Sequence, residues 1–256
     1  MTLPKLGLKA RSFNPNVPHL SAHLAGRDQT PPPDSVDWIR GMPTDLGAML
    51  NNKVNDCSCA AFYHALQVWS FNATGTMDTE PDSNVQALYS AVSGYKPTDA
   101  APGPECNMQD VLTYIVKTGA PVGADGKSVN KLTAFLEIDH RNLDDFKRTI
   151  QECGIAYIGV NVPAYLMASP PPTVWDVEPQ NNKIIGGHAV AAAGYDAQGV
   201  QAISGGKVLT LTWAYLSKYT HEAYALADSS WMSAKGTSPA GLTMEQLQHQ
   251  MQGLKG

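Results

Sequence analysis

The spacing of apolar residues changes past the midpoint of this chain of 256 residues. In the first part, apolar residues recur at helical spacing in four segments, 57–70, 83–92, 107–117 and 142–153. After them come short apolar runs that are typical of buried strands, at 155–162, 189–195 and 208–212. Helices followed by strands predict an α+β fold in which a helical lobe packs against a sheet lobe.

The ends of the chain have a different character. Residues 1–33 are rich in proline and asparagine and lack periodicity, so we expect an extended N-terminal arm. A single domain over 34–235 follows, with a helical lobe at about 34–150 and a sheet lobe at about 151–235. Late in the second lobe, 216–227 returns to helical spacing. Residues 236–256 are expected to be a helical tail, with a Gln-rich amphipathic stretch at 244–251.

Composition excludes several functions. The formal net charge of −5 provides no basic field for a phosphate backbone, which argues against nucleic-acid binding. No run reaches the roughly 18 apolar residues of a membrane span. The N-terminal residues 1–13 lack the apolar core of a secretory signal, so we expect a cytoplasmic or virion-associated protein.

Four cysteines in a chain of this length do not form a disulfide framework. An i,i+2 pair such as Cys57 and Cys59 would bridge only with strain, and both are therefore expected as thiols. Cys57 follows an Asn- and Asp-rich run and stands where a helix should begin. A helix N-terminus favours the thiolate, whereas the adjacent Asp56 disfavours it. The alternative is that both cysteines are small residues of the core.

Two histidines are candidate partners for such a thiol. His188 follows Gly186-Gly187 at the start of a predicted strand, and the two glycines let other main chain approach closely. His64 lies seven residues after Cys57, on the same face of the helix, where a packing role is the stronger interpretation.

Other chemistries fit the sequence poorly. Residues 119–128 resemble a phosphate-binding loop, but the first required glycine is Pro121. Residues 202–206 resemble a serine nucleophile turn only faintly. The spacing of Cys57, Cys59 and His64 matches no common zinc pattern, so we expect neither a metal nor a cofactor.

Three segments together resemble the papain-like cysteine peptidase superfamily, in the family's order. Residues 33–40, Pro-Asp-Ser-Val-Asp-Trp-Ile-Arg, are similar to the mature N-terminus of these enzymes, and Trp38 precedes Cys57 by nineteen residues. Residues 59–62, Cys-Ala-Ala-Phe, are similar to the helix that carries the family's nucleophile. Residues 188–195 are similar to the strand that carries its histidine. The resemblance implies a two-lobe fold with a helical lobe against an antiparallel sheet or barrel.

A narrower resemblance is to poorly characterised bacterial and phage papain-like proteins with a (Gly/Asn)-Asp-Cys-(Thr/Ser) box. Here the box and its approach are residues 51–58, followed by Lys-Thr-Gly at 117–119 and Gly-Gly-His-Ala-Val at 186–190. This match selects Cys57 as the nucleophile. The wider family's Cys-Trp-Ala-Phe pattern would select Cys59 instead.

The resemblance also implies roles for other residues. Cys57 would attack a carbonyl, His188 would act as its general base and then acid, and the Asn51 amide would stabilise an oxyanion. The family's histidine-orienting asparagine is missing, because that place holds Ile203 and Ser204. Ser204 is the weak candidate for this orienting role.

The sequence is compatible with two functions. The first is a thiol hydrolase that acts on peptide or amide bonds of a peptide or protein substrate through a Cys-His dyad. The second is a catalytically weak or inactive papain-like fold with a structural or binding role, such as a phage virion component that holds neighbours through its N-terminal arm. In either case the arm is shorter than the family's usual inhibitory propeptide.

Overall fold

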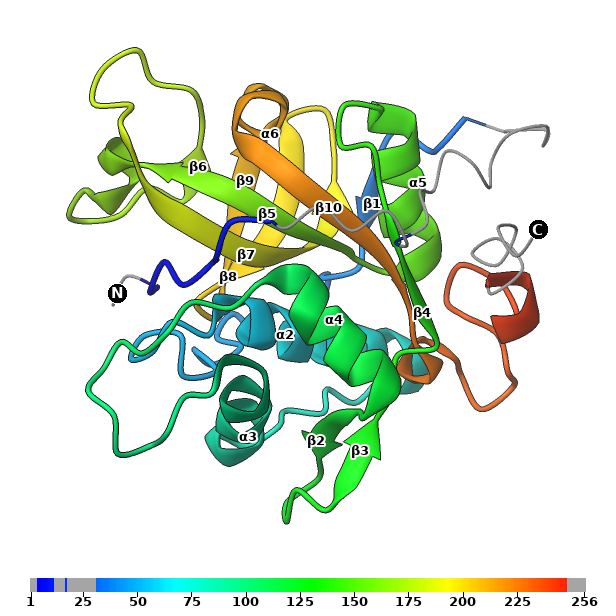
Figure 1. The fold of residues 1–256 in the computed structure, drawn as a ribbon. Helices are drawn as coiled ribbons and strands as arrows, with labels where there is room; N and C mark the ends of the chain where they lie inside the picture. The colour runs from blue at the N-terminus through cyan, green and yellow to red at the C-terminus, as the bar shows by residue number, and fades with distance from the viewer. Residues whose placement is uncertain (1–3, 12–16, 18–30, 248–256) are drawn as a thin grey trace.

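The computed structural model describes residues 4–11, 17 and 31–247, which form two lobes (Figure 1). A sheet with one long central strand makes up the upper lobe in Figure 1, and helices make up the lower lobe. The α+β fold predicted from the sequence, with a helical lobe against an antiparallel sheet, is therefore confirmed.

The sheet is built around strand β7, which runs from Ile184 to Tyr195 and pairs with β5, β8 and the short β1. Its strands lie in the order β4-β10-β5-β7-β8-β9-β6, and the pairs are antiparallel except for β6 with β9. The strand bounds are β1 (Val36–Asp37), β4 (Ala134–Glu137), β5 (Ala156–Pro163), β6 (Val174–Trp175), β8 (Gly199–Ser204), β9 (Lys207–Thr212) and β10 (Thr220–Ala227). β1 and β4 precede residue 150 in the chain but pair within this sheet.

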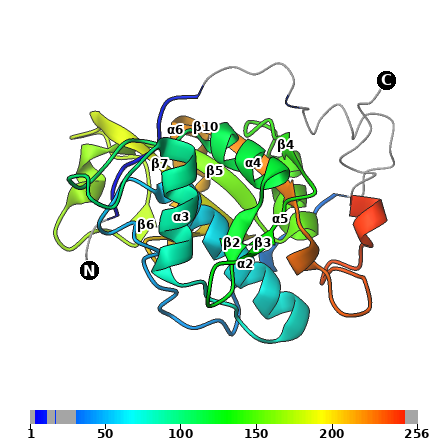
Figure 2. The ribbon, with the colours of Figure 1, turned by 60° about the horizontal axis from the view of Figure 1, so that its bottom comes forward.

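The helical lobe is led by α2 (Cys57–Thr74), which lies against the sheet. Helices α3 (Asp82–Ser93) and α4 (Met108–Lys117) pack on α2, together with a hairpin of β2 (Ala120–Val122) and β3 (Ser128–Asn130). Figure 2 shows α3 and this hairpin on the side of the lobe away from the sheet. The remaining elements are α5 (Leu143–Cys153), α6 (Trp213–Tyr219) and the 3-10 turns η1 (Ala164–Met167) and η2 (Ser229–Trp231).

Helix α2 is the centre of the core. Every residue from Cys57 to Ser70 is buried, because the helix is enclosed by β7, α3, α4 and η2. Its apolar residues surround the helix instead of forming one stripe, as expected for a buried helix. Gly75 ends it in the left-handed conformation, with φ of 80°.

Three tryptophan side chains hold the end of α5. The indole N–H of Trp69 donates to the carbonyl of Cys153 over 2.7 Å, and those of Trp38 and Trp231 donate to Ile150 and Glu152. Carbonyl groups in the last turn of a helix have no partner within the helix. The carbonyl of Ile150 also accepts from the N–H of Gly154, over 3.1 Å, and the tryptophan bonds provide partners for those of Glu152 and Cys153. The three bonds join α2, η2 and the residue after β1 to one helix end.

The four helices predicted over 57–153 and the three predicted strands are confirmed. The helix predicted over 216–227 is wrong beyond Tyr219, because 220–227 is strand β10. β10 lies between β4 and β5 and is buried on both faces, so its residues do not alternate between polar and apolar. An Ala-rich segment without alternation favours a helix by local propensity, and pairing on both sides overrides that preference.

The chain ends are described in part. Residues 4–11 of the predicted arm pass between the two lobes, in dark blue in Figure 1. Residues 244–247 are helical, and the rest of the predicted amphipathic stretch lies outside the described residues. Within the described ranges, no helix combines the length and apolar character that crossing a membrane requires.

Candidate functional site

Cys57 is the first residue of α2 and lies against the sheet. Its thiol is approached by the main-chain N–H groups of Ala189, the residue after His188, and of Gly7 in the arm. Burial raises the pKa of the Cys57 thiol to about 12, because a thiolate without water is unfavourable, and the two N–H groups oppose only part of this effect. With the arm in place, Cys57 is therefore a neutral thiol at pH 7.

His188 projects from β7, whose register places it opposite Val160 of β5. Its Nε2 lies 2.8 Å from Ser204 Oγ, and the Trp175 ring packs at 6.4 Å between centroids. Burial lowers the pKa of His188 to about 4, so the ring is neutral at pH 7. Its Nδ1 makes no hydrogen bond of normal geometry with the described residues, although the Lys5 main chain approaches closely enough to oppose part of the pKa shift.

Asn51 is held by a tight loop just before α2. Met49 and Leu50 both have positive φ, 49° and 65°, which is strained for residues with a side chain. The loop turns the Asn51 amide inward, where its Nδ2 donates to Lys5 O and to Asp56 Oδ1, each over 3.2 Å. The side chain is almost fully buried.

Asp56 lies beneath the same amide and precedes the thiol. Its carboxyl is fully buried, and burial raises its pKa well above the ordinary value, against the opposing hydrogen bond from Asn51. A carboxyl that resists ionisation in this way repels a thiolate at Cys57 less than an exposed aspartate would.

The second thiol candidate, Cys59, points elsewhere. It is fully buried, and its thiol interacts with that of Cys106 instead of with β7. All four cysteines are free thiols. The structure therefore gathers Cys57, Asn51 and His188 around the arm, with Ser204 bonded to the His188 ring. Cys59 lies apart from this group, beside Cys106.

The place that they surround is filled by residues 5–8 of the arm. Lys5 N–H donates to Asn51 O over 2.7 Å, and Leu8 N–H donates to Gly187 O over 3.3 Å. On the helical side, Cys106 N–H donates to Gly7 O and Lys9 N–H donates to Cys106 O, both over 2.9 Å. The arm thus binds main chain to main chain on both lobes.

Glycines make this close fit feasible. A Cβ on Gly7 would lie 2.2 Å from the carbonyl oxygen of Asn55, closer than atoms can approach. Cβ atoms on Gly186 and Gly187 would each meet the arm at 3.0 Å, at Leu6 and at Leu8. The close approach expected at the two glycines before His188 is therefore made by the chain's own N-terminal residues.

Sequence reasoning missed two parts of the site. It did not place residues 5–8 in the cleft, although Gly7 between two leucines was a signal for a close main-chain contact. It also missed Trp175, which covers one side of His188 from a short strand after a proline run. His64, considered as a second histidine, is buried within α2, with its Nδ1 2.8 Å from Gln67 Oε1.

Other features of the described residues lie away from these four side chains. None of their His, Cys, Asp and Glu side chains form a group of three or more that would hold a metal ion. A cavity of about 800 Å³ opens between the end of α2, residues 77–81 and the β2–β3 hairpin. This cavity is not lined by any of the four residues Cys57, Asn51, His188 and Ser204.

Comparison with known proteins supports the fold. No protein-family model matches the sequence, and no curated protein is similar to it in sequence. Among solved structures, xylellain, a cysteine protease from Xylella fastidiosa, matches with a TM-score of 0.65 at 14% identity, covering 88% of this chain and 96% of xylellain.

Two proforms match as well. The Amb a 11 cysteine protease from ragweed pollen has a TM-score of 0.57 at 13% identity, covering 81% of this chain and 68% of that protein. ProCathepsin B from Trypanosoma congolense has a TM-score of 0.54 at 13% identity, covering 88% and 84%. The chain thus has the fold of papain-like cysteine proteases.

Proposed function

We propose that this protein is a papain-like thiol hydrolase of peptide bonds, with Cys57 as nucleophile and His188 as general base, and that residues 4–11 keep it latent. One observation carries the proposal. The Asn51 amide donates to a peptide carbonyl, that of Lys5, in the cleft that also holds the Cys57 thiol and the His188 ring. A peptide backbone therefore fits where attack on a peptide carbonyl would take place.

The residues can supply each proton transfer once the arm has left. The Nδ1 of His188 accepts the Cys57 proton, and the thiolate forms a bond to the carbonyl carbon. The Asn51 amide donates to the oxyanion. The C–N bond then breaks, and the amine leaves with the proton from His188. Water, activated by the same ring, cleaves the thioester and releases the acid.

Ser204 takes the place of the missing asparagine. A hydroxyl that accepts a hydrogen bond from Nε2–H fixes the tautomer in which Nδ1 is free to accept a proton. Trp175 limits the access of water to this bond. A hydroxyl rotates more freely than an amide, so we expect a slower enzyme than one with asparagine.

The structure with the arm in place supports the proposal that the enzyme is latent. Both Cys57 and His188 are almost fully buried, and the pKa directions of the two groups disfavour the thiolate–imidazolium pair. Departure of the arm admits water, which removes the burial effect on both groups. The bacterial or phage subgroup and a virion role remain predictions from the sequence.

Hydrolysis by the full chain tests the proposal. In Gly7→Ala, the new Cβ cannot be seated against Asn55, so the arm leaves the cleft. We expect Gly7→Ala to cleave an unfolded protein such as reduced casein at least tenfold faster than the wild type. Lys9→Ala, at an exposed arm residue, serves as the matched control and should behave as the wild type.

Two double variants identify the nucleophile. Gly7→Ala with Cys57→Ala should be inactive, whereas Gly7→Ala with Cys59→Ala should retain most activity. Leu8→Asp is a second way to displace the arm without touching the cleft walls, because it places a charge where a buried leucine packs. A folded, opened protein without Cys57-dependent hydrolysis would favour the binding role instead.

A further inference from the structure

The cavity between α2 and the β2–β3 hairpin has no part in the proposed hydrolysis. Its volume is about 800 Å³, and its walls come from the end of α2, residues 77–81, the hairpin and Ser230 of η2. Leu66 and Ser70 line it from α2. They follow Cys57 by nine and thirteen residues, so a rise of about 1.5 Å per residue places them roughly 14 and 20 Å along the helix from the thiol. This α2–hairpin cavity is therefore a separate place in the molecule.

Hydrogen bonds hold the walls of the α2–hairpin cavity together. The Glu80 carboxylate accepts two bonds at Oε2, over 2.7 Å from Asn84 Nδ2 and over 2.8 Å from the N–H of Gly123. Asn84 Nδ2 also donates to Gly123 O over 2.8 Å. On the α2 side, Gln67 Nε2 donates to Thr79 Oγ1 over 3.0 Å. Because these bonds form within the chain itself, the cavity exists before a ligand enters, which lowers the entropic cost of binding.

The lining combines apolar side chains with acidic ones. The apolar side chains are Leu66, Met77, Pro81 and Val122, and the acidic ones are Asp78 and Glu80. None of the described residues that line the cavity is a lysine, an arginine or a histidine. Within the described part of the chain, no ion pair joins either acid to a basic side chain. The cavity therefore offers negative charge beside an apolar wall.

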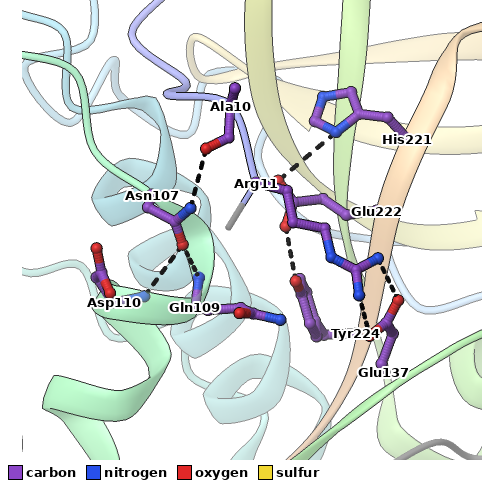
Figure 3. A network of polar contacts seen from close by, with 9 residues as sticks. All are labelled: Ala10, Arg11, Asn107, Gln109, Asp110, Glu137, His221, Glu222 and Tyr224. Carbon is purple, nitrogen blue, oxygen red and sulfur yellow. Dashed lines mark hydrogen bonds and ion pairs between the residues drawn. The ribbon is translucent and has the colours of Figure 1, made fainter. Parts of the chain in front are cut away.

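Elsewhere the chain itself supplies partners for carboxyl groups, as Figure 3 shows for two of them. The Arg11 guanidinium bonds to Glu137, with an Nη2–Oε2 distance of 2.6 Å, and Tyr224 Oη donates to Glu222 Oε2 over 2.6 Å. The two acids of the α2–hairpin cavity have no such cation among the described residues. Charge complementarity thus favours a ligand that brings a positive charge of its own.

Asn130 adds an acceptor without a donor to the same lining. Its Nδ2 donates to Asp228 Oδ1 over 3.0 Å and to Ser230 Oγ over 2.9 Å. Its Oδ1 is buried and has no hydrogen-bond partner among the described residues. Most buried acceptors in proteins are paired, so an N–H donor bound beside Asn130 would supply the bond that is missing.

We propose that the α2–hairpin cavity binds a small organic amine. The apolar body of the amine packs between Leu66 and Val122, and its ammonium group donates to acceptors of Asp78, Glu80 and Asn130. An ammonium has three N–H donors and no acceptor, so it suits a lining of this kind. The inference goes beyond the proposed function, because it involves neither the thiol nor the arm.

Three matched ligands test the inference. Phenylpropylamine is a cation at neutral pH, phenylpropanol is neutral and phenylpropanoate is an anion, and all three have the same apolar body. The protein is the isotopically labelled full-length wild type with the arm in place, and NMR titrations follow its amide signals. The Gly123 signal reports on the cavity directly, because its N–H donates to Glu80.

We expect the amine to bind about fivefold or more tightly than the alcohol, and the anion to bind more weakly than both. The Gly123 signal should shift with the amine. Asp78→Asn combined with Glu80→Gln removes both charges at nearly unchanged size, and should lower the ratio of the two affinities to about twofold or less. Glu178→Gln, at an exposed glutamate of the sheet lobe, is the matched control and should leave the ratio unchanged.

A filled cavity gives a second check on the place of binding. Ala124 is exposed and lines the cavity, so Ala124→Trp should weaken the amine by occupying its space. Equal affinity for the amine and the alcohol would overturn the inference, as would a ratio that the double variant leaves unchanged. Shifts that leave Gly123 unmoved, or no shifts at about 10 mM amine, would also overturn it.

Discussion

At the scale of single residues, the hydrogen bond between His188 and Ser204 is expected to set how fast the proposed dyad works. We expect Ser204→Ala, in the opened Gly7→Ala chain, to lower kcat about tenfold or more, which corresponds to about 1.4 kcal/mol. KM should change little, because Ser204 faces the imidazole and not the peptide. Ser204→Asn should restore part of kcat, and steady-state kinetics with both variants measures these effects.

A merely structural role for Ser204 would give another result. In that case Ser204→Asn, a larger residue at a site only 4% exposed, would be more damaging than Ser204→Ala in both stability and kcat. The comparison of the two substitutions therefore separates orientation of the ring from packing.

The buried His64 predicts how stability depends on pH. Burial lowers its pKa from 6.5 to about 4, so between these values the unfolded chain binds a proton that the folded chain does not. Stability from this group is complete above pH 6.5 and is lost as the pH falls to about 4, by on the order of 3 kcal/mol. Urea unfolding of His64→Gln at a series of pH values should show a slope smaller by up to one proton in this window. An unchanged slope would contradict the assignment.

The sequence was most informative about residues whose neighbours are local or follow a family pattern. Cys57, Asn51 and His188 could be singled out, and the structure gathers them around the arm. Ser204 could be named only as a weak orienter, because nothing in the sequence showed that β8 would bring its hydroxyl to the ring. Lys5 and Trp175 enter the site through distant contacts without a local signal.

At the scale of elements, the tryptophan bonds at the end of α5 predict a specific loss of stability. Trp69→Phe keeps most of the ring but removes the donor to the buried carbonyl of Cys153. We expect the free energy of unfolding to fall by about 1–3 kcal/mol, the usual effect of leaving a buried carbonyl unpaired. Trp213→Phe, which removes a similar bond from a half-buried ring at Asp196, should have a smaller effect in the same urea titration.

The elements also show where sequence patterns mislead. The helices were predictable because their apolar residues recur at a period that strands do not have. β10 was mistaken for a helix because a strand that is buried on both faces shows no alternation, and its alanines favour helix locally. Its identity depends on β4 and β5, which pair with it from far away in the chain.

At the scale of the whole molecule, residues 5–9 of the N-terminal segment lie between the two lobes and bond to the main chain of both. The two-lobe fold followed from the order of the motifs, but the course of the arm did not. An extended segment without periodicity carries no information on what it contacts. The arm was expected to be extended and, in one alternative, to hold neighbours. The described part of it, residues 4–11, bonds instead to both lobes of its own chain.

Alkylation kinetics of the thiols test the central claim most directly. Iodoacetamide would be applied at pH 7 to the full-length wild type, Gly7→Ala and Lys9→Ala, and the modified cysteine would be identified by peptide mass spectrometry. Cys57 should react far more slowly than free cysteine in the wild type and in Lys9→Ala, because it is buried and its pKa is raised to about 12. In Gly7→Ala it should react at least tenfold faster than free cysteine, and His188→Ala should remove that excess. Reaction at Cys59 first, or a Cys57 rate that Gly7→Ala leaves unchanged, would contradict a thiol site closed by the arm.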